Sequence, residues 1–532
     1  MTQPAEMHAR TSQWQRYLAY GALIAILLFF AFVRVRLRHL PLERDEGEYA
    51  YAGQLMLQGV PPYKLAYNMK LPGTYAAYAV IMAVFGETEG GIRLGLLLVN
   101  SASILLVFLL ARRLQGLLAG VIAAATFGLL STRMSVLGLY GHATHFVTLA
   151  ALAGIVLLLQ AIEKQRRGIL FCIGVCMGFA FLMKQPGILF GIFAGMYWLW
   201  MNRDRRISEL ASGSAVFSAG VILPFALTCL ILYDDGVFRD FWFWTFSYAR
   251  AYGSMMSVAD GWRELRKILP WVVRPLAVWM IAGVGLTAIF WDRKVCEKAV
   301  FLLGFLFFSM AAVVPGFYFR PHYFIVVLPV VAIWAGIAVA AAQRKLKGSL
   351  SRPWLAVIPI VIFAAGFAIS PHRHLGFFFQ LHATGANQQL DNRTGFAEAK
   401  EVAGYIEAHS TRQDRLAVFG SEPEIYFYSH RHSATGYIYS YALLEKQDFA
   451  SQMRNQMMAE VERPAPKYAV LVDNEPSWDW GIHPLAQSEV LKPVEEFLRM
   501  HYRLEKQVVI PGNADHRWGS QPSFYVFRRK DT

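Results

Sequence analysis

The sequence YLAYGALIAILLFFAFV, from Tyr17 to Val33, is followed after a short basic stretch by RDEGEY, from Arg44 to Tyr49. The first segment is apolar and approaches the length that a helix needs to cross a bilayer. The second places three carboxylates and an arginine where the chain should just have left that bilayer. Because charge near a bilayer is costly unless it has a use, this acidic motif is the first candidate functional segment.

The composition of the whole chain also predicts a membrane protein. Of its 532 residues, 55% are hydrophobic and only 17% are charged, whereas a soluble domain usually carries about 25% charged residues. Eleven apolar segments are long enough, or nearly so, to cross about 30 Å of hydrocarbon. The predicted spans are Tyr17–Val33, Ile92–Ala111, Leu114–Thr132, Phe146–Ile162, Ile169–Met183, Gly187–Trp200, Ala211–Tyr233, Pro270–Trp291, Ala299–Phe317, His322–Ala342 and Trp354–Ser370.

Lysine and arginine are distributed unevenly among the turns that join these spans. If residues 1–16 are a cytoplasmic tail, the inside turns hold fifteen Lys or Arg, whereas the short outside turns hold one each, Arg133, Lys184 and Arg320. This is the positive-inside pattern. It accounts for most of the net charge of +14, and no nucleic-acid partner is indicated. The odd number of spans then places the C-terminus outside the cell membrane.

We predict an α-helical polytopic membrane domain at residues 17–371, with long outer loops at residues 40–91 and 234–269. The first loop should contain a helix from Asp45 to Gln58, which begins with acids and ends before a glycine. It should also contain a short apolar helix from Pro72 to Phe85 that lies in the membrane interface. Tryptophan and tyrosine among basic residues favour a second interfacial helix in the other loop.

After about Pro371 the chain becomes polar and mixed, which predicts a soluble extracytoplasmic α/β domain at residues 372–532. Its hydrophobic periodicity alternates between helical and extended patterns. The expected helices are Gly395–His409, Pro423–Tyr428 and Leu491–His501, and the expected strands are Arg415–Phe419, Tyr468–Val472, Gln507–Ile510 and Phe524–Arg528. The four cysteines of the chain lie in or beside the predicted spans, so no disulfide framework is indicated.

The predicted outer side of the membrane collects charged side chains of both signs. The carboxylates are Asp45, Glu46 and Glu48, and the cations are Arg93, Lys184 and Arg320. Carboxylates suit a general base or a set of metal ligands, and cations at this depth suit a lipid phosphate. A reaction that consumes a lipid-phosphate-linked donor needs a base for the acceptor and positive charge for the departing phosphate.

Each of these residues also has a simpler structural interpretation. Asp45 and Glu46 could be helix-start residues, because acids there interact favourably with the helix dipole. Lys184 could pair with a structural carboxylate, and Arg320 could extend to the lipid headgroups. The functional interpretation depends on the conjunction of these groups on one side of the membrane.

Other groups on the outer side are open to two interpretations as well. His142 and His145 could be ligands or polar turn residues. Residues 242–252 could form a sugar platform or an aromatic belt at the interface. The basic residues that follow the first span, Arg34, Arg36 and Arg38, are expected to contact lipid headgroups.

Six short motifs occur along the chain, over about residues 17–345. They are Arg44–Ala50, Lys70–Tyr75, Phe85–Leu94, Ala111–Leu114, Met183–Gly187 and Arg320–Pro329. In this order they resemble the membrane glycosyltransferases of the GT-C fold, family 39, which are related to protein O-mannosyltransferases and to the aminoarabinose transferases of lipid A. The C-terminal domain resembles these proteins only loosely.

The resemblance implies a polyprenyl-phosphate-linked sugar donor and an inverting transfer to a hydroxyl of a lipid, glycan or protein acceptor. The reaction would take place at the outer face of a bacterial cytoplasmic (inner) membrane. Asp45 would be the general base or the acceptor-binding carboxylate, with Glu46 beside it. Lipid-phosphate contacts would come from Lys184, Arg320, His322, Tyr323 and Arg93, and acceptor or sugar contacts from Glu48, Tyr49, His142 and His145.

One departure from the family pattern leaves the cofactor open. Many relatives carry a second acid in the outer loop after the third span, whereas this loop reads Gly141-His142-Ala143-Thr144-His145. Neutral imidazole binds transition metals such as Zn or Mn. A divalent cation is therefore a candidate cofactor, and metal dependence stays open.

Three other functional classes compete with glycosyl transfer. A non-catalytic membrane scaffold would leave the charged residues of the outer side unexplained. A membrane transporter or lipid flippase predicts charges near the bilayer midplane and often internal symmetry, and the sequence indicates neither. A ligase or polymerase that uses lipid-linked glycans would share the same site chemistry and differ in its acceptor, so the sequence separates it poorly.

Overall fold

The computed structural model describes residues 3–164, 166–349, 353–372, 379, 395–478, 486–511 and 521–531. Within it the chain forms two compact units. The first, here called the helical unit, comprises residues 1–36, 96–227 and 258–381. The second, the mixed unit, comprises residues 37–95, 228–257 and 382–532. The predicted boundary between residues 371 and 372 adjoins residues outside the described ranges and stays a prediction.

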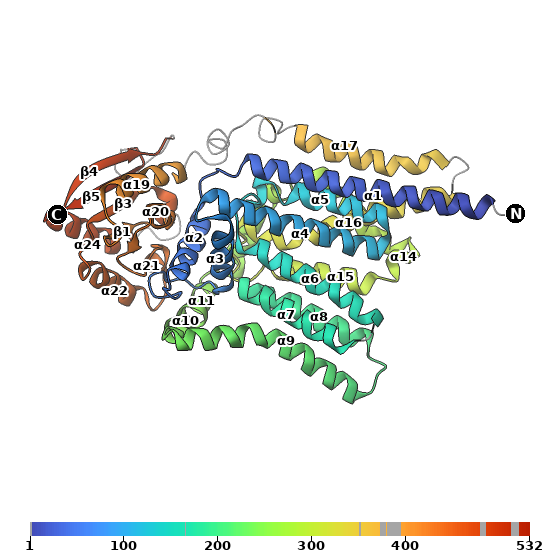
Figure 1. Cartoon of the computed structure of the whole chain (residues 1–532), viewed down its shortest axis with the longest axis horizontal. Helices are drawn as coiled ribbons and strands as arrows, with labels where there is room; N and C mark the ends of the chain where they lie inside the picture. The colour runs from blue at the N-terminus through green and yellow to red at the C-terminus, as the bar shows by residue number, and fades with distance from the viewer. Residues whose placement is uncertain are drawn as a thin grey trace. The chain divides into compact units, whose positions relative to one another are not determined.

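The helical unit is a bundle built around α16 (Figure 1). Apolar side chains cover α16 (Leu328–Ser349) on all sides, so its hydrophobic segment is wholly buried. It packs against α5 (Leu117–Leu130) and α13 (Leu276–Thr287), and α5 packs against α1 (Gln3–Arg36). The other helices are α4 (Glu89–Gln115), α6 (Ala143–Lys164), α7 (Arg167–Met183), α8 (Ile188–Met201), α9 (Ile207–Asp234), α12 (Val258–Val272), α14 (Arg293–Cys296), α15 (Ala299–Ala311) and α17 (Ile358–His372). Residues 89–95 of α4 and 228–234 of α9 belong to the mixed unit.

Helix length separates two classes of apolar helix in this bundle. In the described part of the chain, five helices are long and apolar enough to cross a membrane, or six if a bent pair counts as one span. The other predicted spans coincide with apolar helices of 10–17 residues. One prediction was wrong in detail, because α12 and α13 meet at 105° and residues 270–291 are not a single straight helix. Pro275, which directly precedes α13, supplies no backbone N–H at this break.

The predicted inside turns meet at one end of the helical unit. Arg344 at the end of α16 forms an ion pair with Asp292 at 2.9 Å and donates to Oε1 of Gln115 at 2.8 Å. Gln115 in turn donates to the backbone carbonyl of Lys294, and Arg113 forms an ion pair with Glu163 at 2.5 Å. These contacts connect the turns after α4, α6, α13 and α16.

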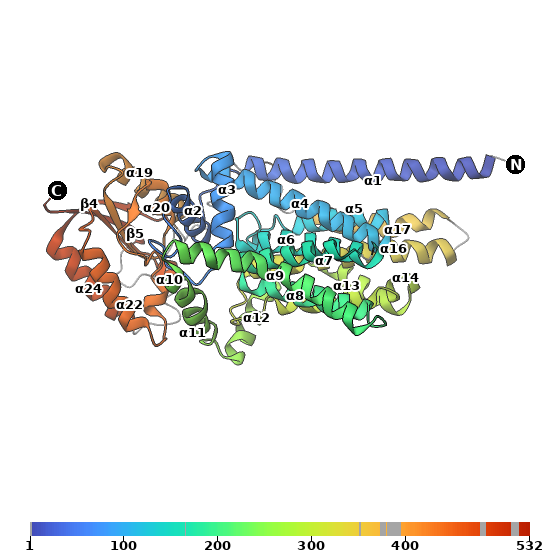
Figure 2. The ribbon, with the colours of Figure 1, turned by 60° about the horizontal axis from the view of Figure 1, so that its bottom comes forward.

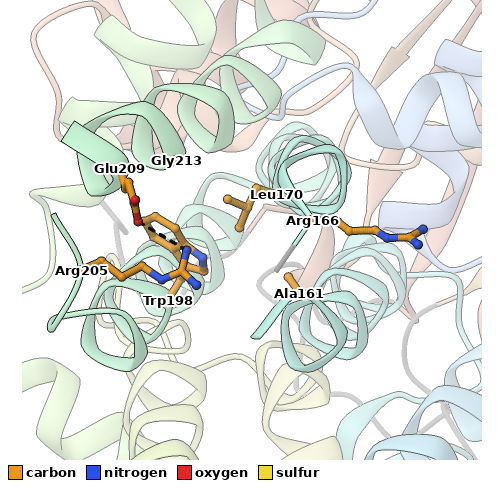
Figure 3. A pocket seen from close by; sticks show the side chains of 7 residues that line it. All are labelled: Ala161, Arg166, Leu170, Trp198, Arg205, Glu209 and Gly213. Atoms are coloured by element: carbon orange, nitrogen blue, oxygen red, sulfur yellow. Dashed lines mark ion pairs between the residues drawn. The ribbon is translucent and has the colours of Figure 1, made fainter. Parts of the chain in front are cut away.

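A cavity of about 260 Å³ opens among the helices at the same turns. Figure 3 shows Arg205 and Glu209 beside the ring of Trp198, whereas the side chain of Arg166 points away from them. Gly213 allows this packing, because a Cβ there would lie 2.3 Å from the ring of Trp198. The lining contains none of the residues that the sequence predicts for catalysis or donor binding.

Arg34 corrects one expectation about the basic residues after the first span. Its side chain is buried rather than turned toward headgroups. It donates to Asn100 Oδ1 at 3.2 Å and to the carbonyls of Ser131 and Gly138 at 2.8 and 3.0 Å. Arg34 therefore joins α1 to α4 and to the loop after α5.

The mixed unit contains a five-stranded sheet in the order β2-β1-β3-β5-β4. Strands β2 (His432–Ser433), β1 (Arg415–Phe419) and β3 (Tyr468–Asp473) are parallel, with Leu416 opposite Tyr468 and Phe419 opposite Leu471. The last two strands, β4 (Tyr502–Val509) and β5 (Ser523–Arg529), are antiparallel. The helices around the sheet are α19 (Phe396–His409), α20 (Glu424–Ser429), α21 (Tyr441–Leu444), α22 (Ala450–Glu462), α23 (Glu475–Trp478) and α24 (Ala486–His501).

The sequence predictions located the four longer strands of this sheet and missed four elements, β2, α21, α22 and α23. Strand β2 has only two residues, His432 and Ser433, and offers no periodicity to detect. Helix α22 did carry a signal, because its buried residues Ala450, Met453, Met457 and Val461 recur at helical spacing. The polar residues between them obscured it.

The first outer loop folds into the mixed unit rather than standing apart. Its two helices, α2 (Arg44–Leu57) and α3 (Gly73–Phe85), begin and end within one residue of the predictions. Helix α2 packs against α3 and also against α20. Figures 1 and 2 show α10 (Phe238–Trp242) and α11 (Ala249–Gly253), from the second outer loop, in the same unit.

Candidate functional site

The acidic motif begins α2 with a reciprocal capping arrangement. Glu43 is the N-cap, and its side chain accepts from the backbone N–H groups of Asp45 and Glu46 at 2.9 and 3.3 Å. Glu46 accepts in return from the backbone N–H of Glu43 at 3.2 Å. These bonds satisfy N–H groups that a helix start otherwise leaves without a partner. The helix-start interpretation of Glu46 therefore has a direct structural basis.

Glu46 also forms a buried ion pair with Arg93 at the start of α4. The two side chains are 0% and 4% exposed. Arg93 donates further to the carbonyl of Pro41 at 3.3 Å. A residue predicted for catalysis is thus paired with a residue predicted for the donor phosphate. The pair joins α2 to residues 89–95 of α4, which belong to the same unit, and removing one member of such a pair typically costs about 3–5 kcal/mol.

Asp45 belongs to a second charged group, centred on Lys70 in the loop before α3. The Nζ atom of Lys70 lies 2.8 Å from Asp45 Oδ1 and 2.5 Å from Glu48 Oε2. The hydroxyl of Tyr75 donates to Glu48 at 2.5 Å, and the Tyr49 ring centroid lies 4.6 Å from the same ammonium. We call Asp45, Glu48, Tyr49, Lys70 and Tyr75 the Lys70 cluster.

The two carboxylates of this cluster differ in access. The Asp45 side chain is 21% exposed, whereas that of Glu48 is 0% exposed. Burial raises the pKa of Glu48, and the negative charge of Asp45 adds to this effect against the opposing charge of Lys70. Burial by itself lowers the pKa of Lys70, but Asp45 and Glu48 outweigh it and hold that pKa well above the usual range. Asp45 is therefore the carboxylate of the pair that a substrate can reach.

Lys70 was not among the predicted site residues, although a signal for it existed. It stands in Lys70-Leu71-Pro72-Gly73, one of the motifs that carry the family resemblance. A single lysine in a loop gives no periodic pattern. Only the folded loop brings it between two acids that precede it by more than twenty positions.

A cluster of aromatic and basic residues forms in the helical unit, at the end of α7. Lys184 Nζ lies 3.6 Å from the ring centroid of Tyr323. His322 stacks on His142 with centroids 4.0 Å apart and planes inclined by 10°, and its carbonyl accepts from the hydroxyl of Thr144 at 2.9 Å. The structure therefore gathers three predicted lipid-phosphate residues and one predicted acceptor residue.

Arg320 and His145 lie at the margins of this cluster. Arg320 precedes the short 3-10 helix Pro321–Val327, and its guanidinium lies 5.9 Å from the ring centroid of Tyr318. His145 is buried and bonded to the backbone of Gly138 and Tyr140, which fixes the loop before α6. His142 and His322 offer imidazole nitrogens, whereas structural zinc usually has four protein ligands and catalytic zinc three.

The aromatic stretch 242–252 is mostly packing rather than an open platform. Trp244 and Tyr248 are each 4% exposed. Trp244 stacks on Tyr67 with centroids 5.3 Å apart, and Tyr437 meets it edge-on. Trp242, at 47% exposure, is the member that presents its ring outward.

Part of the sequence is similar to known glycosyltransferases. Residues 70–246 match the model of the dolichyl-phosphate-mannose-protein mannosyltransferase family. An undecaprenyl phosphate-alpha-4-amino-4-deoxy-L-arabinose arabinosyl transferase of Pseudomonas aeruginosa (strain LESB58) is 32% identical over 215 residues. This alignment spans 38% of this chain and 38% of the relative. A second such transferase, from Pseudomonas fluorescens (strain ATCC BAA-477), is 26% identical and spans 57% of this chain and 53% of the relative.

Two solved structures share the fold. ArnT from Cupriavidus metallidurans, bound to undecaprenyl phosphate, has a TM-score of 0.57 at 18% identity and covers 95% of this chain and 97% of that one. The oligosaccharyltransferase AglB from Archaeoglobus fulgidus, in complex with an inhibitory peptide and a dolichol-phosphate, has a TM-score of 0.54 at 12% identity. The match covers 95% of this chain and 75% of the AglB chain.

These comparisons confirm the predicted fold class and the resemblance to GT-C glycosyltransferases. The chain is a multi-pass helical membrane protein with a small C-terminal domain that contains a sheet. The chain matches about two fifths of the length of the Pseudomonas aeruginosa relative.

Proposed function

We propose that this protein is a glycosyltransferase that moves a sugar from a polyprenyl-phosphate-linked donor to an acceptor hydroxyl, with inversion. The observation that carries this proposal is the Lys70 cluster. It presents one accessible carboxylate, Asp45, and keeps the second one, Glu48, buried. The sequence match to transferases that use such donors supports the same conclusion.

Asp45 would act as the general base. A base must be ionised before it takes the acceptor proton, and the Lys70 ammonium at 2.8 Å favours the ionised form. Lys70 also holds the carboxylate in one orientation. Removal of a general base typically costs about 10²–10⁴-fold in rate.

Lys184 and the neighbouring aromatic groups would bind the lipid phosphate of the donor. As the bond to the sugar breaks, negative charge develops on the phosphate oxygens, and a fixed cation stabilises it. The ring of Tyr323 attracts the Lys184 ammonium without cancelling its charge. His322, Arg320 and Arg93 remain candidates for further contacts, although Arg93 already pairs with Glu46.

The orientation that we propose places the N-terminus in the cytoplasm and the C-terminal domain outside it, at a bacterial inner membrane. The gathering of basic turns at one end of the helical unit supports this orientation. The positive-inside rule assigns such an end to the cytoplasm. A reporter domain that is active only after export, fused after residue 532, should therefore be active. An inactive but folded fusion would contradict this orientation.

The experiment that tests the function uses the full chain, purified in detergent, with a panel of polyprenyl-phosphate sugars and a mixture of lipid, glycan and protein acceptors that carry free hydroxyl groups. We expect one donor to be consumed and free polyprenyl phosphate to be released. Mass spectrometry measures both. Asp45→Asn should reduce turnover at least about 100-fold while donor binding and folding persist. Wild-type turnover by that variant would reject Asp45 as the base, and no consumption of any donor would count against the function.

The same assay addresses the cofactor and the acceptor. Turnover measured with a chelator, and then with Zn²⁺ or Mn²⁺ added back, reports metal dependence. Acceptor candidates are lipids, glycans and proteins with free hydroxyl groups. Release of polyprenyl phosphate with each class added in turn identifies the acceptor that raises the rate.

A further inference from the structure

The three parallel strands of the mixed unit have their carboxyl ends on the same side of the sheet, here called its carboxyl edge. Another segment of the same unit lies against this carboxyl edge. Ser421 and Glu422 follow β1, Tyr439 lies in the segment after β2, and Ser477 follows β3. In open α/β sheets, ligands bind outside the carboxyl ends of the parallel strands. Here this position receives the first turn of α2, which bears the acidic motif.

Arg44 forms the stronger part of this contact. Its guanidinium donates to the Ser421 carbonyl at 2.5 Å, to the Tyr441 hydroxyl at 2.9 Å and to Glu422 Oε1 at 2.8 Å. The Glu422 side chain is 0% exposed, and the hydroxyl of Ser477 donates to its other oxygen at 2.6 Å. Charge-assisted bonds of this kind are about twice as strong as neutral ones.

Tyr439 reaches the accessible carboxylate itself. Its hydroxyl donates to Asp45 Oδ1 at 3.2 Å, the same oxygen that Lys70 contacts. The Tyr439 ring lies 5.5 Å from the Lys70 ammonium. Tyr439 is 8% exposed, so the surrounding structure restricts the rotation of its side chain.

The rest of α2 continues the same contact. A Cβ at Gly47 would lie 2.6 Å from the backbone nitrogen of Glu424, so the glycine allows α20 to approach. One turn later, the hydroxyl of Tyr51 donates to Ser433 Oγ at 3.0 Å and accepts from the Ser433 N–H at 2.7 Å. The motif therefore meets the C-terminal domain at Arg44, Asp45, Gly47 and Tyr51.

We propose that the C-terminal domain is a positioning device for the base. Its carboxyl strand edge grips α2 through Arg44 and Glu422, and Tyr439 orients the Asp45 carboxylate. Tyr439 is a positioning residue, because it acts through Asp45. The mechanistic part of this inference rests on the proposed function, whereas the grip on α2 does not.

The first test compares Tyr439→Phe with Tyr437→Phe in the full chain. Tyr437 lies two positions away, and its hydroxyl donates to Gln456 instead. Loss of a hydrogen bond to a charged group should shift the acid limb of the pH–rate profile upward by about one pH unit. Tyr439→Phe should therefore be about tenfold slower below that limb and recover at higher pH, with donor KM unchanged. Tyr437→Phe should keep the wild-type profile.

Two outcomes of this test would overturn the role of Tyr439. One is an unchanged pH profile in Tyr439→Phe. The other is a loss of equal size at every pH, which is the signature of a structural defect. A matching shift in Tyr437→Phe would also contradict the proposal, since that hydroxyl does not contact Asp45.

The second test measures the grip without any reaction. Amide hydrogen exchange of residues 44–57 reports opening of α2. Glu422→Gln should speed this exchange about tenfold, because it removes the charge opposite Arg44. Glu505→Gln is the matched control, since in the described part of the chain Glu505 contacts Tyr405, Tyr468 and Arg528, all within the C-terminal domain. Equal exchange in both variants would refute the grip, and this result is independent of whether any donor is consumed.

Discussion

Lys70 in the mixed unit and Lys184 in the helical unit are both lysines of predicted outer segments, and their surroundings differ. Lys70 lies within 3 Å of two carboxylates, whereas Lys184 lies against the face of an aromatic ring. A carboxylate attracts an ammonium through opposite charge, while an aromatic ring, which has no net charge, attracts it through its quadrupole. The first lysine is suited to orient an acid, and the second to receive an anion.

Replacing each lysine by methionine is the strongest way to break this comparison. Lys70→Met leaves Glu48 buried without its cation, so we expect a clear loss of thermal stability together with loss of turnover. Lys184→Met should raise the KM for the lipid-phosphate donor by about tenfold or more. Thermal unfolding and donor titration check the two halves. A stable, active Lys70→Met variant would contradict the distinction, as would wild-type donor affinity in Lys184→Met.

The Glu46–Arg93 pair offers a second test, of intermediate size. If the pair is structural, Glu46→Ala or Arg93→Ala alone should cost about 3–5 kcal/mol of stability, and the double variant should recover part of this cost. Chemical denaturation of the purified variants measures it. The isosteric Glu46→Gln variant, if it folds, should retain most of the turnover. A folded Glu46→Gln variant as inactive as Asp45→Asn would instead support the catalytic role predicted for Glu46.

The smallest expected effect concerns Glu424, which lies behind Gly47 at the carboxyl edge of the sheet. Burial, followed by the charge of Glu422 and to a smaller extent that of Glu43, raises its pKa well above the usual range, while Arg44 opposes the shift. The folded state then keeps a proton that the unfolded state releases, so stability falls as the pH rises above the unfolded pKa of about 4.3. The slope is at most about 1.4 kcal/mol per pH unit.

The Glu424→Gln variant checks this sign, since it carries no proton to release. Between pH 5 and pH 8, the melting temperature of the wild type should decline relative to that of the variant. Glu489→Gln, on the exposed side of α24, serves as a control. Its melting temperature should differ from that of the wild type by the same amount at every pH. A wild type that gains stability over the variant with rising pH would contradict the buried, protonated state.

Much of the site could be read from residue types and spacing, and the remainder could not. The acidic motif predicted a helix start, because acids in a first turn interact favourably with the helix dipole, whereas the capping box of Glu43 was seen only in the structure. The pairing of Lys184 with Tyr323 and of His142 with His322 involves residues more than a hundred positions apart. Such pairs leave no local pattern, and the role of Lys70 was missed for the same reason.

The sequence alone determined the membrane class of this protein, the positions of most of its apolar helices and four of the five strands of its sheet. These properties follow from local hydrophobicity and periodicity, which each segment carries by itself. The tertiary structure decided which charges are neutralised and which stay accessible. Asp45, Glu46 and Glu48 all carry a carboxyl group, and the sequence does not distinguish their surroundings. In the structure Asp45 contacts Lys70 and Tyr439. Glu46 pairs with Arg93, and Glu48 is buried against Tyr75. The state of a carboxylate depends on burial and on neighbouring charges, and distant parts of the chain supply both.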